Sequence, residues 1–559
     1  MLISQKWLTS LLNNAGNPGW SVSAEELDAG FVRVGFETEG YEPLPETTGP
    51  LVIGRVEEIE ELTEFRKPIR YCQVNVGKAN GTGELQGIIC GARNFKEGDY
   101  VVVSLPGAVL PGGFEISARE TYGHISNGMM ASEAELGFTS KSDGIIVLPE
   151  SAGELGQDAH EVLGGPDTIF EVNITPDRGY ALSARGLGRE VASAFDLEYK
   201  DMADDPSIAG IDVAGVPAPT GDLISITLEE SAKVQRFGLR KVEGIDPAVE
   251  APFWMKRVLM LAGVRSVNAA TDVTNYVMLL LGQPMHAFDA DKVAGGLRVH
   301  NAQGGEEFET LDHTKRTLTP GDVVISDDTG IQSLAAIMGG TTSEISEDTT
   351  NVYFEAASWD ALTVARSARH HKLSSEASRR FERGVDPTII EVALDMACAL
   401  LVQIAGGTIS DKLTLVEGAL QKREPINLRV KHPSELIGVE YSKATVIKRL
   451  QEVGCEITDN GDVLVVTPPA WRTDLNEPVE LIEEIVRLEG LDDIPLVLPT
   501  PRGGRGLSQE QRRRRAVTHA LAYSGYVEII PTPFMSNTVV DTWGLDADDP
   551  RRNTVAVQN

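Results

Sequence analysis

The stretch 271–289 contains a run of apolar residues with polar side chains on either side of it. Such polar side chains can bind a ligand. The stretch reads T-D-V-T-N-Y-V-M-L-L-L-G-Q-P-M-H-A-F-D, and the pattern predicts a buried helix ended by Gly282 and Pro284. Polar residues at 274–275 and at His286 are then separated by about three helical turns. We expect His286 on a loop after the helix. A histidine beside an apolar helix is often only a core residue, so a structural role is the alternative.

A glutamate lies inside the apolar run 352–359, V-Y-F-E-A-A-S-W. The run is typical of a β-strand. A carboxylate buried there is costly unless it has a partner. Alternation along the strand equally allows Glu355 to point outward from the edge of a sheet, and the residues alone leave both alternatives open.

Five carboxylates follow one another closely within 471–485, W-R-T-D-L-N-E-P-V-E-L-I-E-E-I, and four of them are candidates for a metal site. Pro478 suits the first turn of a helix, and the spacing then places three glutamates on one face, just after an aspartate. Oxygen ligands in this number suit Mg²⁺. Acidic residues near a helix start also stabilise the helix dipole, which is the structural alternative. The candidate metal ligands are Asp474, Glu480, Glu483 and Glu484.

Composition restricts the function classes. A length of 559 residues suggests roughly four domains. No apolar run approaches the ~18 residues of a membrane span, and four scattered cysteines favour reduced cytoplasmic thiols over disulfides or zinc. The net charge of −33 argues against broad nucleic-acid affinity. Basic runs at 366–383 and 502–515 leave a local RNA-binding face open, although most such runs are solvated helix faces.

The elements that must position these residues belong to several domains. Apolar residues at helical spacing predict an amphipathic helix within 1–12. Five or so short strands between 51 and 148, separated by Gly and Pro, predict an OB-type barrel, which could bind nucleic acid or another protein. A linker rich in Asp, Pro and Gly is expected at 201–222. A mixed α/β domain follows, and a helix at 387–405 ends it.

The last third contains a smaller unit and a basic segment. A helix capped by Ser442 and a hairpin turning at Asn460-Gly461 predict a winged-helix-like arrangement. From Leu507 a basic helix is expected, followed by a strand over 526–534. The fold class is therefore multidomain α+β. The predicted domains are 1–40 with 151–200 (N-terminal α/β domain), 41–150 (inserted barrel), 223–405 (mixed α/β), 418–495 (winged-helix-like) and 505–559 (an incomplete module).

Several of these segments together resemble a known family. Q-P-M-H-A-F-D, A-A-I-M-G-G (335–340), V-Y-F-E-A-A-S-W and S-S-E-A-S-R-R-F-E-R-G-V-D (374–386) are similar, in this order, to the editing domain of the beta subunits of bacterial phenylalanine–tRNA ligases. I-C-G-A-R-N and L-P-G-A-V-L-P-G-G-F-E-I resemble the tRNA-binding OB domain of that family. The resemblance implies an editing pocket lined by Thr274, Asn275, Pro284, His286, Gly339, Glu355, Ser375 and Ala377.

The resemblance also implies what the pocket does. It would hydrolyse the ester of tyrosine mischarged on tRNA(Phe), with Glu355 binding the phenol hydroxyl and His286 orienting water or the terminal ribose. Gly339 would bring backbone N–H groups close to the ester. Ser375 stands where the family commonly has Thr, which keeps the hydroxyl and loses a methyl. Positive charges at 366–383 could contact phosphates, and salt bridges to neighbouring acids explain them equally well.

Partners and cofactors follow from the same resemblance. We expect a cytoplasmic α2β2 enzyme whose alpha subunit uses ATP and L-phenylalanine, with Mg²⁺ on the four carboxylates and a last module that is C-terminally truncated. The residues contain no P-loop or other adenylation motif. A free-standing editing hydrolase and a non-enzymatic tRNA-binding scaffold are the alternatives. The basic helix after Leu507 favours a subunit that assembles with a partner.

Overall fold

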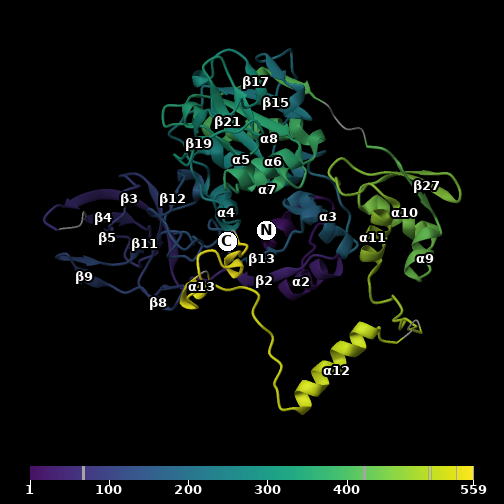
Figure 1. Cartoon of the computed structure of the whole chain (residues 1–559). Helices are drawn as coiled ribbons and strands as arrows, with labels where there is room; N and C mark the ends of the chain where they lie inside the picture. The colour runs from purple at the N-terminus through teal and green to yellow at the C-terminus, as the bar shows by residue number, and fades with distance from the viewer. Residues whose placement is uncertain (66–68, 419–422, 501–502, 505, 537, 558–559) are drawn as a thin grey trace. The chain divides into compact units, whose positions relative to one another are not determined.

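The computed structural model describes residues 1–559 except 66–68, 419–422, 501–502, 505, 537 and 558–559. Residues Met1–Pro495 form one compact unit and Leu496–Asn559 a second. Figure 1 labels the elements of both units, and each unit is described by itself.

A three-stranded antiparallel sheet near the N-terminus is built from distant parts of the chain. Its strand order is β1 (Leu2–Ser4), β13 (Thr168–Val172) and β2 (Thr38–Pro43), so β13 pairs on both sides. Helices α1 (Gln5–Asn14), α2 (Ala24–Arg33) and α3 (Ala184–Ala194) pack with this sheet. The N-terminal helix is shorter than its apolar pattern predicted, because Leu2–Ser4 are taken into the sheet. We call these elements the N-terminal domain.

A six-stranded, nearly closed barrel sheet lies between β2 and β13. Its members are β3 (Leu51–Leu62), β4 (Ile69–Asn75), β5 (Gln86–Cys90), β6 (Tyr100–Ser104), β11 (Met129–Met130) and β12 (Val147–Leu148). The alternating residues Val52, Val74, Val101 and Val103 are buried on one side of the sheet. Two small hairpins flank the barrel: β7 (Val109–Leu110) with β8 (Phe114–Glu115), and β9 (Arg119–Thr121) with β10 (His124–Ser126).

The middle domain, residues 223–417, contains a small hairpin of β18 (Glu307–Glu309) with β19 (Lys315–Thr317), and two larger sheets. One has the order β16 (Met285–Asp289), β23 (Asn351–Ser358), β15 (Arg236–Glu243), β24 (Thr408–Glu417). The other has the order β14 (Ile226–Leu228), β17 (Leu297–Asn301), β20 (Val323–Ser326), β21 (Ile331–Leu334), β22 (Met338–Gly339). Met285 and His286 were predicted on a loop, and this was wrong because residues 285–289 pair with β23.

Helices of the middle domain pack around its sheets, and Ala269–Leu281 and Ile390–Ala405 contact the first sheet directly. The helices are α4 (Phe253–Leu261), α5 (Ala269–Leu281), α6 (Ala361–His370), α7 (Glu376–Phe381) and α8 (Ile390–Ala405), and Figure 1 shows α5 to α8 grouped beside β15. The segment Pro387–Ala405 is long and apolar enough to cross a membrane by length and composition, but 56% of its most apolar stretch is buried inside the protein. It packs against α5, β15 and β23 as a core helix.

The small domain, residues 426–491, follows the predicted order of elements. Strand β25 (Ile426–Arg429) precedes α9 (His432–Ile437) and α10 (Lys443–Glu452), and the Ser442 hydroxyl accepts from Thr445 N at 3.1 Å. Strands β26 (Glu456–Asp459) and β27 (Val463–Thr467) form the predicted hairpin, with Gly461 at φ +83°. Helix α11 (Pro478–Glu489) begins at the predicted proline.

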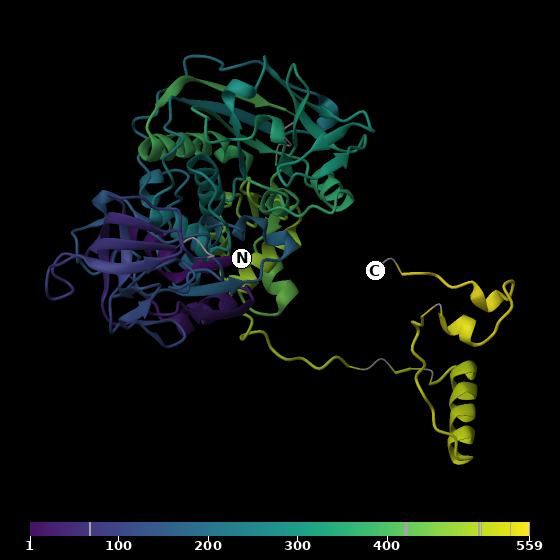
Figure 2. The same cartoon turned by 90° about the vertical axis from the view of Figure 1, so that its left-hand side faces the viewer.

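The second unit, Leu496–Asn559, has few buried residues. Its helix α12 (Gln509–Tyr523) has none, and Figure 2 shows it as a straight rod near the yellow end of the chain. A short helix α13 (Thr538–Thr542) follows. The predicted strand over 526–534 is wrong, since these residues form no strand, and their large apolar side chains, Ile530 at 96% exposed among them, lie in solvent. No element within this unit pairs with them in the part that the structure describes.

Candidate functional site

One cavity of about 360 Å³ in the middle domain contains most of the predicted pocket residues. Its walls come from the turn before α5, from α5 and β16, from the loop around β22, and from β23 and α7. Seven of the eight predicted residues line it: Thr274, Asn275, Pro284, His286, Gly339, Glu355 and Ala377.

Glu355 and His286 face each other across two paired strands. They are direct partners in the antiparallel register of β23 and β16, so both side chains leave the same face of the sheet. Glu355 is 6% exposed and lies on an internal strand, which excludes the predicted alternative of an outward-pointing edge residue. Glu355 Oε2 and His286 Nε2 are buried and have no hydrogen-bond partner among the described residues. Buried polar atoms without partners are rare and mark a place for a ligand or water.

Burial alters the protonation of both groups. Desolvation raises the pKa of Glu355 to about 8. Desolvation also lowers the pKa of His286 to about 4. At neutral pH the pocket therefore contains a largely protonated carboxyl and a neutral imidazole. The first can donate a hydrogen bond as well as accept one, and the second keeps one ring nitrogen as an acceptor.

The glycine at 339 leaves space for the histidine ring. A Cβ atom placed on Gly339 would lie 2.3 Å from His286 Cε1 and 2.6 Å from His286 Nε2. The imidazole packs edge-on against Phe288 at 4.4 Å between ring centroids. Ala336, in the loop before β22, has φ +65°, a conformation that costs energy for a residue with a side chain. Because residue 339 has no side chain, the loop lies closer to His286 than it could if this position carried a Cβ atom.

Local sequence explains how α5 reaches the pocket. The Asn268 side chain caps the helix by accepting from Thr271 N at 2.9 Å, and Gly282, at φ +82°, ends it. The buried Gln283 amide then donates to Ala357 O of β23 at 2.9 Å. This contact ties the turn to the strand that carries Glu355. Asn275 lines the cavity with a side-chain amide that has no partner among the residues described.

Ser375 does not line the cavity. Its hydroxyl accepts from Ser378 N at 3.0 Å as the N-cap of α7, and Ala377, two residues on, reaches the wall instead. The extra methyl group of a threonine at position 375 would therefore lie at the start of α7 and outside the cavity. A change of pocket shape by this residue is indirect at most.

The basic residues of 366–383 divide into two groups. Arg380, 1% exposed, bonds to Glu376, and Arg383 bonds to Glu382. Arg379 lies 3.6 Å from Glu376. The exposed residues Arg366, Arg369 and Lys372 form no ion pair with any residue that the structure describes.

The four predicted metal ligands do not form a common group. Glu480 accepts from the backbone N–H of Glu477 at 2.7 Å and from that of Asn476, at the start of α11. Asp474 is paired with Arg472, and Glu483, 66% exposed, accepts from Arg178 Nη2 at 3.2 Å. Glu484 is buried among three arginines. The described residues contain no cluster of three or more His, Cys, Asp or Glu suited to a metal, and this donor set does not fit Mg²⁺.

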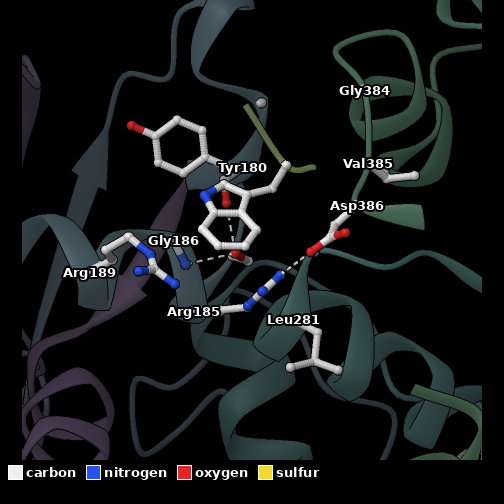
Figure 3. A pocket seen from close by; sticks show the side chains of 12 residues that line it. Tyr180, Arg185, Gly186, Arg189, Leu281, Gly384, Val385 and Asp386 are labelled. Atoms are coloured by element: carbon white, nitrogen blue, oxygen red, sulfur yellow. Dashed lines mark hydrogen bonds and ion pairs between the residues drawn. The ribbon is translucent and has the colours of Figure 1, made fainter. Parts of the chain in front are cut away.

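A second, much smaller cavity lies where three domains meet. Its volume of about 20 Å³ holds roughly one water molecule, and it is lined by Tyr180, Arg185 and Trp471, among others. Figure 3 shows the Arg185 side chain directed at Asp386, to which it donates at 2.9 Å. Trp471 lies over the guanidinium groups of Arg185 and Arg189 at 4.8 and 4.6 Å. These contacts are those of a structural junction.

Sequence reasoning missed several residues of the large cavity. Arg265 is exposed on its wall and is the one arginine or lysine among the lining residues. Met338 and Phe381 add apolar surface. Gln283, a lone amide between Gly282 and Pro284, could have been recognised as a turn-fixing residue. Arg265 carries no comparable signal, because it lies in a loop without a pattern.

Family models match four segments of the chain. They are described as a tRNA binding domain (residues 51–158), a B3/4 domain (233–406), a tRNA synthetase B5 domain (426–491) and a phenylalanyl tRNA synthetase beta chain CLM domain (494–559). The matched segments correspond to the barrel, the middle domain, the small domain and the second unit.

Proteins similar to this chain over its whole length are phenylalanine–tRNA ligase beta subunits. The chain is 67% identical to the phenylalanine–tRNA ligase beta subunit of Corynebacterium glutamicum over 100% of this chain and 67% of that protein. It is 53% identical to that of Nocardia farcinica over 100% of this chain and 66% of the relative. The chain thus spans about two thirds of these relatives. An N-terminal fragment of the beta subunit from Pyrococcus horikoshii aligns over 88% of this chain and 99% of the fragment, at 13% identity and a TM-score of 0.34, too low to bear on the fold.

Proposed function

The chain belongs to the family of phenylalanine–tRNA ligase beta subunits, and from this premise we propose that its large cavity hydrolyses tyrosine from mischarged tRNA(Phe). The observation that carries the proposal is the buried, unpartnered Glu355 Oε2 opposite the equally unpartnered His286 Nε2. Membership of a ligase family and a match to a tRNA-binding domain support a tRNA ester as the substrate. The pocket chemistry supports the hydrolytic step.

Glu355 supplies the discrimination. A tyrosine hydroxyl donates one hydrogen bond and accepts others, and a protonated or ionised carboxyl can complement it. Phenylalanine would leave the buried carboxyl unpaired. Sites built to hydrogen-bond a hydroxyl reject the analogue that lacks it by about 10⁴–10⁵-fold. An apolar synthetic site, in contrast, rejects an added hydroxyl only about 10²-fold, which is the reason for a second pocket.

Hydrolysis breaks the ester between the tyrosine carboxyl and a ribose oxygen of the tRNA end. Water adds to the carbonyl carbon, the ribose oxygen leaves with a proton, and tyrosine and tRNA are released. A neutral His286 can accept from this water or from the terminal ribose through Nε2. The unpaired amide of Asn275 can bind the ribose or the ester, and Gly339 allows close approach of backbone N–H groups.

RNA approach and assembly belong to the same proposal. The exposed, unpaired cations Arg265, Arg366, Arg369 and Lys372 can contact phosphates without first breaking ion pairs. The bare helix α12 and the exposed apolar residues 526–534 support assembly with an alpha subunit into α2β2 in the cytoplasm. Use of ATP and L-phenylalanine is then assigned to that partner.

The test measures release of tyrosine from purified Tyr-tRNA(Phe), by the chain alone and with the alpha subunit added. We expect release by the parent. Glu355→Gln should reduce the preference for Tyr-tRNA over Phe-tRNA by at least about tenfold, since an amide replaces the titratable partner. Leu436→Ala, on the exposed surface of the small domain, is the matched control.

The outcomes separate the alternatives. Release by the chain alone favours a hydrolase that does not need its partner. Release only after the alpha subunit is added favours a site completed by assembly. If neither condition releases tyrosine while tRNA still binds, the chain is a tRNA-binding scaffold and the editing proposal is wrong.

A further inference from the structure

The Glu484 carboxylate is fully occupied by guanidinium groups. Its side chain is 1% exposed. Oε1 accepts from Arg178 Nη1 at 2.7 Å and from Arg487 Nε at 2.8 Å. Oε2 accepts from Arg487 Nη2 at 2.7 Å and from Arg472 Nη1. An ionised carboxylate offers about four lone-pair positions, so none remains for a metal ion.

The surrounding charges are already balanced. Arg487 also bonds to Glu190 at 2.7 and 3.1 Å, and Arg472 to Asp474 at 2.6 and 2.9 Å. Three arginines therefore face three largely buried carboxylates, those of residues 190, 474 and 484, and Arg178 also contacts the exposed carboxylates of Asp177 and Glu483 at 3.3 and 3.2 Å. A Mg²⁺ ion, which requires oxygen ligands at about 2.0–2.1 Å, would add two positive charges and displace at least one guanidinium. Both changes are unfavourable in a buried site.

The cluster crosses a domain boundary. Arg178 and Glu190 belong to the N-terminal domain, whereas Arg472, Glu484 and Arg487 belong to the small domain. Arg487 Nη1 donates in addition to Val34 O at 2.8 Å, at the end of α2. The Tyr180 hydroxyl donates to Glu190 at 2.5 Å, and Arg472 lies 5.0 Å over the Tyr180 ring. Arg178 and Arg487 thus donate across the domain boundary. Arg472 and Tyr180 orient the carboxylates that accept these bonds.

We propose that Arg178, Arg472 and Arg487 with Glu190, Asp474 and Glu484 form a metal-free interdomain lock, and that Glu484 does not bind Mg²⁺ in this chain. The lock fixes the angle of α11 against α3, because several charged hydrogen bonds with fixed geometry are satisfied together in only one arrangement. The neighbouring stack of Trp471 on Arg185 and Arg189 adds a second fixed point at the same boundary, and Figure 3 shows these two arginines beside the small cavity.

Calorimetric titration of the EDTA-treated 559-residue chain with MgCl₂ tests the metal directly. We expect no saturable heat attributable to residues 474–484 and no change in hydrogen exchange of α11 between EDTA and Mg²⁺. A saturable site in the parent that disappears in Glu484→Gln would overturn the proposal.

Hydrogen exchange of the variants tests the lock itself. Glu484→Gln should accelerate exchange on both sides of the boundary, in 478–489 and in 176–194, by at least about tenfold, because buried guanidinium groups lose their partner. Glu480→Gln and Glu483→Gln, on the same helix, should have a clearly smaller effect, because the amide at position 480 keeps an oxygen that can cap the helix start and Glu483 makes one contact, 3.2 Å to Arg178, from an exposed position. A Mg²⁺ site instead predicts similar effects for all three glutamates.

A milder variant keeps the test decisive if Glu484→Gln does not fold. Glu190→Gln removes one partner of Arg487 from the other side of the boundary and leaves Glu484 in place. It should accelerate exchange in 478–489 although it changes no residue of that helix. Acceleration confined to 176–194 would show that the two domains are not coupled through this cluster.

Discussion

Two buried glutamates of this chain have opposite surroundings. Glu355, in the middle domain, is 6% exposed, and its Oε2 has no partner among the residues described. Glu484, at the boundary of the small domain, is equally buried and bonded to three arginines. Burial raises the pKa of Glu355 to about 8, whereas the arginine guanidiniums hold the pKa of Glu484 well below its usual range despite burial. An incomplete set of partners indicates a place for a ligand, and a complete set indicates a structural role.

Isosteric amide substitutions provide the strongest test of this contrast. Glu484→Gln should lower the free energy of unfolding of the small domain by about 3–5 kcal/mol, because buried charges lose their partner. Glu355→Gln should change stability by less than about 1 kcal/mol at pH 4.5, where a neutral, unpartnered carboxyl is replaced by a neutral amide. Urea unfolding followed by segment-resolved hydrogen exchange measures both. Equal losses would abolish the distinction between the two sites.

The pH dependence of stability should separate the same two groups. The folded pKa of Glu355, about 8, lies above the ordinary value of 4.5, so its stabilising contribution is complete below pH 4.5 and is lost as pH rises to about 8. The stability difference between parent and Glu355→Gln should therefore fall by about 1.4 kcal/mol per pH unit in this window. Unfolding measured between pH 5 and 8 gives the slope.

Glu484 provides the comparison for that slope. Its folded pKa is depressed, so its contribution is present above pH 4.5 and is lost only as pH falls below that value. The difference between parent and Glu484→Gln should be flat between pH 5 and 8. A flat profile for Glu355→Gln as well would mean that its carboxyl is ionised in the folded chain.

A third test concerns the space beside His286. Gly339→Ala places a Cβ within 2.3 Å of the imidazole, so the ring must move and tyrosine release should fall by about tenfold or more. Gly321→Ala is a matched control, because a Cβ atom placed on Gly321 would lie 3.8 Å from the nearest atom, Thr319 Oγ1, which is an ordinary contact. The assay is tyrosine release from Tyr-tRNA(Phe). Full activity of Gly339→Ala would remove His286 from the proposed site.

The smallest effect is expected at Ser375. Because the hydroxyl caps α7 and does not line the cavity, Ser375→Thr should retain the cap and change stability by only a few tenths of a kcal/mol. Tyrosine release should change by less than about twofold. A larger change in release would show that the α7 start influences the cavity shape.

The elements that local patterns define were predicted correctly. The apolar helix ending at Gly282, the helix capped by Ser442 and the hairpin at Asn460-Gly461 all occur where expected. Each depends on residues within one turn or one strand. Seven of the eight pocket residues also share one cavity, although the resemblance to a family supplied that set.

The errors concern contacts between distant residues. Residues 285–289 form a strand because β23, some 70 positions later, pairs with them, and no local pattern reveals that partner. The apolar residues 526–534 have strand-like composition but no strand to pair with in the described part of their unit. The carboxylates near 480 have metal-like spacing, yet Arg178, 306 residues away, bonds to Glu484. Spacing along one helix does not indicate which cations approach from elsewhere.

Strand β13 gives the N-terminal domain a fixed order of formation. It pairs with β1 and with β2, and Ser4 Oγ bonds to Asp167 across 163 positions of sequence. During synthesis, α1 and α2 emerge long before the strand that completes their sheet, and closing so long a loop is slow. Within the barrel Val52 pairs with Asp158, so a barrel that folds first shortens this loop by bringing its ends together. We expect completion of the N-terminal sheet to be faster when the barrel is already folded.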